Sequence, residues 1–65
     1  MNKLRKYTDE IGGVSEMAKL LNVSISLVSH WLTGFRPVTP EKAKLIEEVT
    51  NGAVTRADLR PDVFL

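Results

Sequence analysis

Cysteine is absent from this chain of 65 residues, and histidine occurs once, as His30. Without cysteine the chain can form neither the disulfides that stabilise many small secreted domains nor a thiolate metal site of the zinc-finger type. A single histidine is a poor metal site by itself, so the sequence predicts no metal and no cofactor. The core must therefore come from apolar side chains alone, and 43% of the residues are hydrophobic.

Long hydrophobic runs are also missing. No stretch approaches the length needed to span a membrane, and the first ten residues carry five charges where a secretory signal would have an apolar segment. We therefore expect a protein of the cytoplasm with no membrane partner. Neither sign of charge predominates, because nine basic and eight acidic residues leave a net charge of +1. Where the charges lie is thus more informative than their total.

Apolar residues recur at steps of three and four along most of the chain, which is the period of an amphipathic helix. Capping residues and glycines divide this pattern into four or five short helices, and no strand pattern appears. The chain is predicted to be one all-helical domain over residues 1–65. The expected helices span about residues 3–11, 14–21, 25–32, 40–51 and 55–60.

The second and third expected helices are joined by only three residues. Asn22 tolerates the left-handed backbone that ends a helix sharply, and Ser24 is a favoured N-cap for the helix that follows. Two short helices joined by such a turn are typical of a helix-turn-helix unit, which exposes one face of its second helix to the DNA major groove. The sequence places this unit at residues 14–33.

Packing between these two helices sets further requirements. The first helix needs a small residue at its middle so that the second can cross closely, and Ala18 meets that need. The second helix needs branched or aromatic anchors, which Val28 and Trp31 supply. Because Trp31 is spaced from Val28 as a core residue, we interpret it as structural and not as a base-stacking side chain.

A resemblance to the phage Cro and YdaS-like helix-turn-helix transcriptional regulators covers about three-quarters of the chain, in GGVSEMAKLLNVSISLVSHWLTGFRPVTPEKAKLIEEVTNGAVTRADLRPD. The resemblance implies an all-helical fold like that of the lambda repressor and Cro. It also implies that the third helix enters the major groove of a palindromic operator and that the protein represses transcription by occupying this operator. A phage or prophage regulator of this kind acts in the cytoplasm of a bacterial host, where DNA holds it at the nucleoid.

The outward face of the third helix supplies the candidates for base contact. Short hydroxyls can bond to base edges or phosphates, isoleucine can contact a thymine methyl group, and histidine can donate to a guanine acceptor or a phosphate. The alternative for the serines is a plain solvated helix face. None of these residue types makes a bidentate base contact, so DNA shape and water bridges can carry part of the specificity. The candidates are Ser24, Ile25, Ser26, Ser29 and His30.

Phosphate contacts are expected from polar and basic residues around that helix. Arg36 lies in the following loop, and Lys42 lies near the start of the fourth helix, whose capped N-terminal amides also attract anions. Thr33 comes just past the third helix, and Lys19 on the second helix is a secondary candidate. The alternative for Arg36 and Lys42 is that they are solvated surface charges.

Other residues that could suggest a functional role have a simpler structural explanation. Arg56 and Arg60 occur together with Asp58 and Asp62, and pairing within this short helical segment accounts for the four charges. They are not assigned to DNA. Gly12 and its neighbour Gly13 match no phosphate-loop spacing, so we expect them to separate the first two helices.

One recognition helix reads only a few base pairs, and a symmetric dimer on a palindromic site doubles the contacts. We therefore expect a homodimer, at least on its double-stranded operator DNA, and no small-molecule ligand. The dimer interface is assigned to the apolar C-terminal tail and to the surface around the last expected helix. Its residues are Val54, Leu59, Val63, Phe64 and Leu65.

Two other classes of function compete with DNA binding. The same fold can serve as an antitoxin or adaptor that acts mainly by protein–protein contact. The near-neutral net charge leaves this alternative open, and the resemblance permits it, because YdaS-like relatives include antitoxins. An enzyme needs a pocket in which a nucleophile, a base or a metal cluster converge, and the outward polar residues show no such convergence. The sequence therefore predicts that the chain is not an enzyme.

Overall fold

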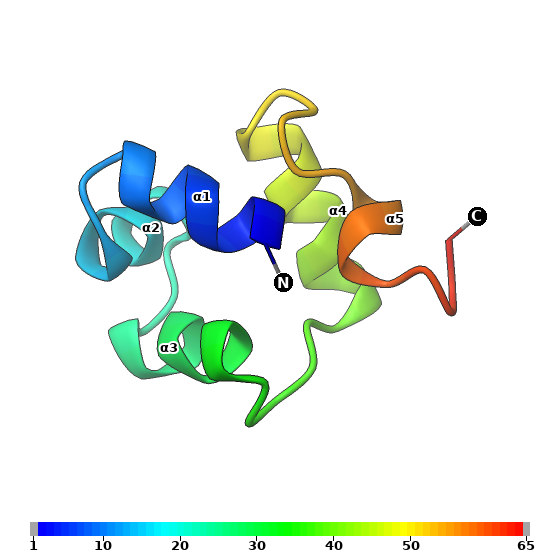
Figure 1. Cartoon of the computed structure of the whole chain (residues 1–65), viewed down its shortest axis with the longest axis horizontal. Coiled ribbons are helices and arrows are strands. Elements are labelled where there is room, and N and C mark those ends of the chain that lie inside the picture. The colour runs from blue at the N-terminus through cyan, green and yellow to red at the C-terminus, as the bar shows by residue number, and fades with distance from the viewer. Residues whose placement is uncertain (1, 65) are drawn as a thin grey trace.

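The computed structural model describes residues 2–64 and contains five short helices in that range (Figure 1). No strand occurs among these residues, so the all-helical prediction is confirmed. Each helix lies close to its predicted position. The bounds are Asn2–Glu10 for α1, Val14–Leu21 for α2, Ile25–Thr33 for α3, Pro40–Val49 for α4 and Arg56–Leu59 for α5.

Hydroxyl side chains define the starts of three helices. Ser24 Oγ accepts a hydrogen bond from the backbone N–H three residues on at 3.1 Å, and Thr39 Oγ1 accepts the equivalent bond at 3.3 Å. Thr55 and Asp58 form a full capping box, in which each side chain accepts the other's backbone N–H. Because each cap satisfies a backbone donor that the helix leaves free, these residues fix where α3, α4 and α5 begin.

The core lies where the helices meet, and all five contribute to it. Figure 1 shows α3 below α1 and α2, with α4 and α5 on the other side of the molecule. Val28 is fully buried and the adjacent Leu27 is only half-buried, so Val28 lies on the inner face of α3. The buried apolar residues are Leu4, Met17, Ala18, Leu21, Val28, Trp31, Val38, Ala43, Ile46, Val54 and Leu59.

Val54 and Leu59 belong to this core, which corrects their assignment to an interface between copies. Their exposed fractions are 0% and 4%, so neither side chain is available to a partner. The turn between α4 and α5 explains the difference. Hydrogen bonds between the Val54 backbone and the Thr50 side chain hold the chain against the end of α4, and this turn directs Val54 inward.

The C-terminal tail is also partly engaged with its own protomer. Phe64 is half-buried against the core, and the Lys44 ammonium and the Arg56 guanidinium lie 5.8 and 5.6 Å from its ring centroid. Val63 is 48% exposed, and Leu65 lies outside the described residues. Within residues 2–64, Val63 is therefore the predicted interface residue with the most available apolar surface.

Two buried threonines were not expected from the apolar pattern. Thr8 donates its hydroxyl to the Leu4 carbonyl oxygen at 2.7 Å, inside α1. Thr50 follows α4, and its hydroxyl oxygen accepts from the Val54 amide at 3.1 Å. Each hydroxyl thus has a partner in the interior, which is why a polar side chain is tolerated there.

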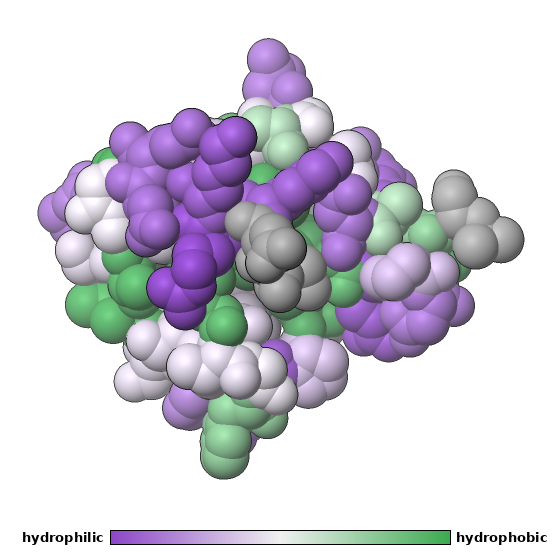
Figure 2. Space-filling view, in the orientation of Figure 1, coloured by the Kyte–Doolittle hydropathy of each residue, from purple (hydrophilic) through white to green (hydrophobic). Residues whose placement is uncertain are grey.

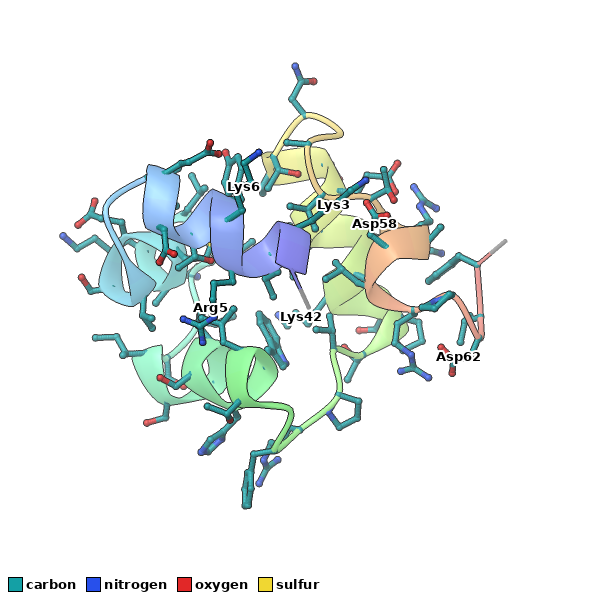
Figure 3. All side chains as sticks on the ribbon, in the orientation of Figure 1. Lys3, Arg5, Lys6, Lys42, Asp58 and Asp62 are labelled. Atoms are coloured by element: carbon teal, nitrogen blue, oxygen red, sulfur yellow. The ribbon has the colours of Figure 1, made fainter. Side chains whose placement is uncertain are left out.

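Charged pairs connect α5 to other elements, whereas the sequence predicted pairing within the helical segment itself. Glu47 Oε1 in α4 accepts from the Arg56 backbone N–H at 2.6 Å and from Arg56 Nε at 3.0 Å. Lys3 Nζ in α1 lies 3.3 Å from Asp58 Oδ2 (Figure 3). Arg56 and Asp58 are two residues apart and so do not face each other on a helix, which is why each pairs with another element.

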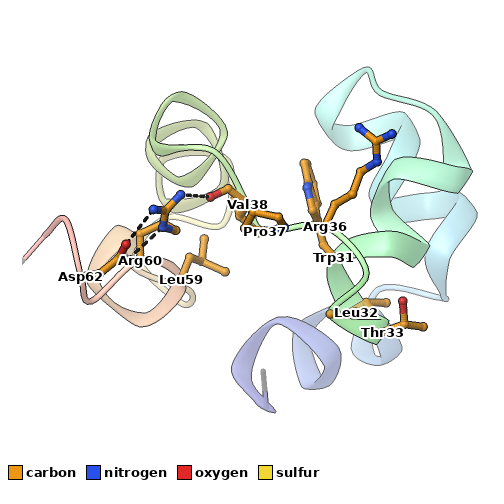
Figure 4. A pocket seen from close by; sticks show the side chains of 10 residues that line it. Trp31, Leu32, Thr33, Arg36, Pro37, Val38, Leu59, Arg60 and Asp62 are labelled. Carbon is orange, nitrogen blue, oxygen red and sulfur yellow. Dashed lines mark hydrogen bonds and ion pairs between the residues drawn. The ribbon is translucent and has the colours of Figure 1, made fainter.

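Arg60 joins the end of α5 to the loop that precedes α4. Its guanidinium donates to the Val38 carbonyl oxygen at 3.0 Å and to both carboxylate oxygens of Asp62 at 2.9 and 2.7 Å (Figure 4). The hydrogen bonds between the two side chains lower the pKa of Asp62 and raise that of Arg60. Arg60 therefore does pair with Asp62, which lies past the end of the helix.

The buried threonines provide a matched test of the turn after α4. Thr50→Val should lower the free energy of unfolding by about 1–3 kcal/mol, because the buried Val54 amide loses its acceptor. Thr8→Val is the control and should lower it by at most about 1 kcal/mol, since the helix backbone still bonds the Leu4 carbonyl and no buried group is left without a partner. Chemical denaturation would measure both variants, and equal losses would rule out this role for Thr50.

Acid should weaken the links made by Glu47 and Asp58. Hydrogen bonds from Arg56 lower the pKa of Glu47, and those from Thr55 lower the pKa of Asp58. A carboxyl with a lowered folded pKa stabilises the fold above its unfolded pKa of about 4, and this contribution is lost as the pH falls through the folded value. The free energy of unfolding should therefore decline below about pH 4.

Denaturation measured across this pH range would test the assignment. Glu47→Gln should flatten the decline, whereas Glu48→Gln, at an exposed position on the same helix, should leave it unchanged. An identical pH profile for Glu47→Gln and the unaltered protein would contradict it.

Candidate nucleic-acid interface

The turn between α2 and α3 has the geometry that the sequence predicts. Asn22 has φ 57° and ψ 46°, a left-handed conformation that ends α2. Its N–H donates to the Lys19 carbonyl at 3.2 Å, and the Val23 N–H donates to the Ala18 carbonyl at 3.0 Å. These bonds fold the turn back on the last part of α2, so α3 starts in a fixed direction at Ser24.

The inner side of this bihelical unit is fully packed. Helices α2 and α3 pack directly on each other. Ala18, Val28 and Trp31 have exposed fractions of 3%, 0% and 4%, which confirms the three packing positions expected from the sequence. With these side chains inside, the opposite face of α3 is left to solvent, at the lower edge of Figure 1.

The predicted base-contacting residues lie along this outer side of α3. Ser24, Ile25 and Ser26 are exposed, and Ile25 is 55% exposed despite being apolar. Ser29 and His30 are half-buried. Ser24 Oγ accepts the capping bond, which leaves its hydroxyl hydrogen and one lone pair free for a further hydrogen bond. In Figure 2 the region of α3 is mostly pale, whereas α1 is strongly hydrophilic.

Arg36 and Lys42 line one open hollow next to α3, although six positions separate them in the sequence. The hollow has a volume of about 340 Å³ and lies between α3, the following loop and the start of α4. Leu27, Trp31 and Pro37 provide apolar walls, and the α4 N-cap also borders it. Among residues 2–64 neither Arg36 nor Lys42 forms an ion pair, so both cations are available to an anion.

The other two phosphate candidates are more constrained. Lys19 Nζ lies 3.3 Å from Glu16 Oε2 on the surface of α2, so part of its charge is already balanced. Thr33 is exposed at the end of α3, and its hydroxyl lies 3.4 Å from the His30 carbonyl oxygen. Of the four phosphate candidates, Arg36 and Lys42 are therefore the two that line one hollow and form no ion pair within residues 2–64.

A second groove lies on the other side of the loop. Its volume is about 540 Å³, and Leu32, Pro37, Val38 and Leu59 form much of its lining. Figure 4 shows Arg60 on its α5 side, tied to Asp62 and Val38, while Arg36 extends from the loop in the opposite direction. Arg36 also lines this groove, but only Arg60 is paired with a carboxylate.

The basic residues of α1 point in different directions. Figure 3 shows Arg5 between α1 and α3, whereas Lys3 and Lys6 lie on the far side of α1 from α3. Lys3 is occupied by Asp58. Lys3 and Lys6 therefore do not contribute to the charge around the outer face of α3.

Neither a metal cluster nor a membrane span is found in the described part of the chain. Residues 2–64 contain no group of three or more histidine, aspartate or glutamate side chains placed to hold a metal ion. No helix in this range is long and apolar enough to cross a membrane.

One exposed side chain at the site was not among the sequence-based candidates. Phe35 is 73% exposed, and its ring centroid lies 4.8 Å from that of His30. The sequence feature that could have identified Phe35 as a site residue is its position directly after Gly34, the residue that ends α3. Its contact with His30 depends on how the loop folds back, which local sequence patterns do not reveal.

A bihelical unit with a tight left-handed turn, packed on three further helices, defines a helix-turn-helix protein with an all-helical Cro-like fold. The Cro protein from the prophage element Xfaso 1 of Xylella fastidiosa strain Ann-1 has a similar structure, with a TM-score of 0.85 and 42% sequence identity. The match covers 100% of this chain and 98% of that one.

The chain belongs to the family described as bacterial toxin YdaS, whose sequence model matches residues 4–65. A relative in Escherichia coli strain K12, named "Putative transcriptional regulator YdaS", is 43% identical over 53 residues. These residues are 82% of this chain and 54% of the relative, so the chain spans about half the length of that curated protein. The resemblance to Cro and YdaS-like proteins is thereby confirmed.

Proposed function

We propose that this chain is a sequence-specific regulator of transcription that binds double-stranded DNA and represses by occupying an operator, in the manner of a phage or prophage Cro protein. The observation that carries the proposal is that Arg36 and Lys42 line one hollow next to α3, which borders this helix at Leu27 and Trp31. A helix that enters the major groove needs cations next to it to bind the flanking phosphates. The names of the Cro and YdaS relatives support the same function.

In this proposal α3 reads base edges with short side chains. Ser26 and Ser29 can donate or accept single hydrogen bonds, and the exposed Ile25 can contact a thymine methyl group. His30, in the last turn of α3, can donate to a guanine or a phosphate. Single contacts discriminate less than bidentate ones, so the operator should also be recognised by its shape.

A chain with a net charge of only +1 can still bind phosphates if its unpaired cations lie beside α3. In this proposal Arg36 and Lys42 contact the DNA backbone on one side of α3. The N-terminus of α4, which is the positive end of its dipole, lies at the same hollow. Thr33 and Lys19 add contacts nearer α3 and α2. Many of the other cations are balanced by carboxylates, as in the pairs of Arg56 with Glu47 and of Lys3 with Asp58.

The operator is proposed to be palindromic and to be bound by a symmetric dimer, with half-sites about one helical turn of DNA apart. A two-fold interface must be complementary to itself. Val63 is the candidate contact in the described tail, because it is apolar and 48% exposed while Phe64 packs on its own protomer.

A protein-directed role is the second candidate. The chain would then act as an antitoxin, toxin or adaptor mainly through contact with another protein. The net charge of +1 and the description of the family as a bacterial toxin favour it. Binding of DNA distinguishes the two candidates, since a protein-directed module has no need for a salt-sensitive site for phosphates.

Selection of bound DNA from a random pool, at low and moderate salt, would test the DNA-binding proposal. The unaltered protein should enrich a palindrome. Ser26→Ala and Ser29→Ala should each weaken discrimination at particular base positions, by about 1 kcal/mol for a single hydrogen bond. Arg36→Ala should weaken all sites about equally and reduce the salt slope by about 0.9 for each phosphate that the variant no longer binds.

Lys6→Ala is the matched control for Arg36→Ala, because Lys6 is an exposed cation on the far side of α1 (Figure 3). It should leave both affinity and salt slope unchanged. No enrichment at either salt concentration would contradict the DNA-binding proposal and favour the protein-directed role.

The dimer contact can be tested separately. Val63→Ser should weaken self-association in sedimentation equilibrium, on a palindromic duplex if not in the free protein, because it removes apolar area from the proposed interface. Leu20→Ser is the control, since Leu20 is similarly exposed at 46% but lies on α2. Unchanged association in the Val63 variant would assign the interface to another surface.

A further inference from the structure

Phe35 is the most exposed of the large hydrophobic residues in the described part of the chain. Its exposed fraction is 73%, compared with 55% for Ile25, 48% for Val63 and 46% for Leu20. Phe35 is also absent from the side chains that pack on the core. Its aromatic ring therefore contributes little to folding of the protomer, and its position requires another explanation.

The backbone on both sides of Phe35 is tied to the last turn of α3. Gly34 adopts φ 80° and donates its N–H to the Trp31 carbonyl at 3.3 Å. The Arg36 N–H donates to the His30 carbonyl at 3.2 Å. Because these two bonds flank Phe35, the residue is held at a defined place next to α3 even though its side chain lies in solvent.

The ring of Phe35 packs against the imidazole of His30. The two centroids are 4.8 Å apart and the ring planes are inclined by 48°, which is within the range of favourable aromatic pairs. Phe35 thus restricts the orientations of the one histidine on the outer side of α3. Figure 2 shows apolar atoms projecting below α3, in the region where Figure 1 places the loop after that helix.

We propose that Phe35 is a positioning residue for DNA recognition. It orients the His30 ring toward one base pair, while the exposed face of the Phe35 ring packs on the neighbouring base pair. The thymine methyl group is the apolar group that the major groove offers to such a ring. The pair therefore extends the reading surface of α3 beyond its C-terminal end. This inference rests on the proposed DNA-binding function.

The test uses the DNA selected by the unaltered full chain. Phe35→Ala should reduce affinity for the selected site by about tenfold, the usual effect of removing one specific base interaction, while affinity for random duplex stays the same. In repeated selections, Phe35→Ala should remove the base preference at the same DNA position as His30→Ala. It should also remove a preference for thymine at the adjacent base pair. The salt slope should not change, because in this inference both rings contact bases and not phosphates.

A double-mutant cycle separates positioning from independent contact. His30→Ala should reduce affinity in the unaltered protein and have little effect in the Phe35→Ala background. Phe35→Tyr keeps the ring and should retain the base preference, whereas Phe35→Leu keeps only apolar bulk and should lose the preference at the His30 position. Thermal melting should give the same midpoint for the three Phe35 variants as for the unaltered protein, because Phe35 lies outside the core.

Three results would overturn the inference. Selection of no site by the unaltered protein would remove the proposed function and this inference together. A selected site whose base preferences survive Phe35→Ala would leave the function standing and reject Phe35 alone. Loss of dimer association in Phe35→Ala with intact base preferences would identify Phe35 as a contact between two copies of the chain.

Discussion

Ala18 allows α2 and α3 to pack closely, and the burial of Val28 and Trp31 on the second helix fixes which side of α3 turns inward. All other features of the candidate interface follow from this packing. Once two anchors on α3 are inside, the remaining faces are assigned by the helical period, which leaves Ser26 and Ile25 outside. Rotation of α3 about its axis would bury its serines and expose tryptophan.

The loop after α3 divides the surface into two regions with different roles. On one side, Arg36 and Lys42 border an open hollow and form no ion pair within residues 2–64. On the other side, Arg60 is held by Asp62 and by the Val38 carbonyl. Arg60 thus helps to hold the fold together, whereas Arg36 and Lys42 lie beside α3 without an ion pair in the described part of the chain. This separation explains how a protein of net charge +1 can present a locally basic surface.

Similarity to known proteins and the residues of the candidate interface provide different information about this protein. Similarity to a solved Cro protein over essentially all of both chains establishes the fold and the class. It does not by itself assign the contacts, because the outer face of α3 is built from serine, isoleucine and histidine and has no residue that makes bidentate base contacts. In the proposed mode of binding, recognition rests on single contacts, and the contact of His30 with Phe35 restricts the orientation of one of these side chains.

Local chemistry in the sequence determined the five helices, the caps at Ser24 and Thr39, and the turn at Asn22, because each depends on residues within one helical turn. Contacts between distant segments were decided only by the tertiary structure. The burial of Val54, the pairing of Arg56 with Glu47 and the shared hollow of Arg36 and Lys42 all require chain segments to meet in space. A pattern read along the sequence records which faces are apolar, but not which partner each side chain finds when those faces pack.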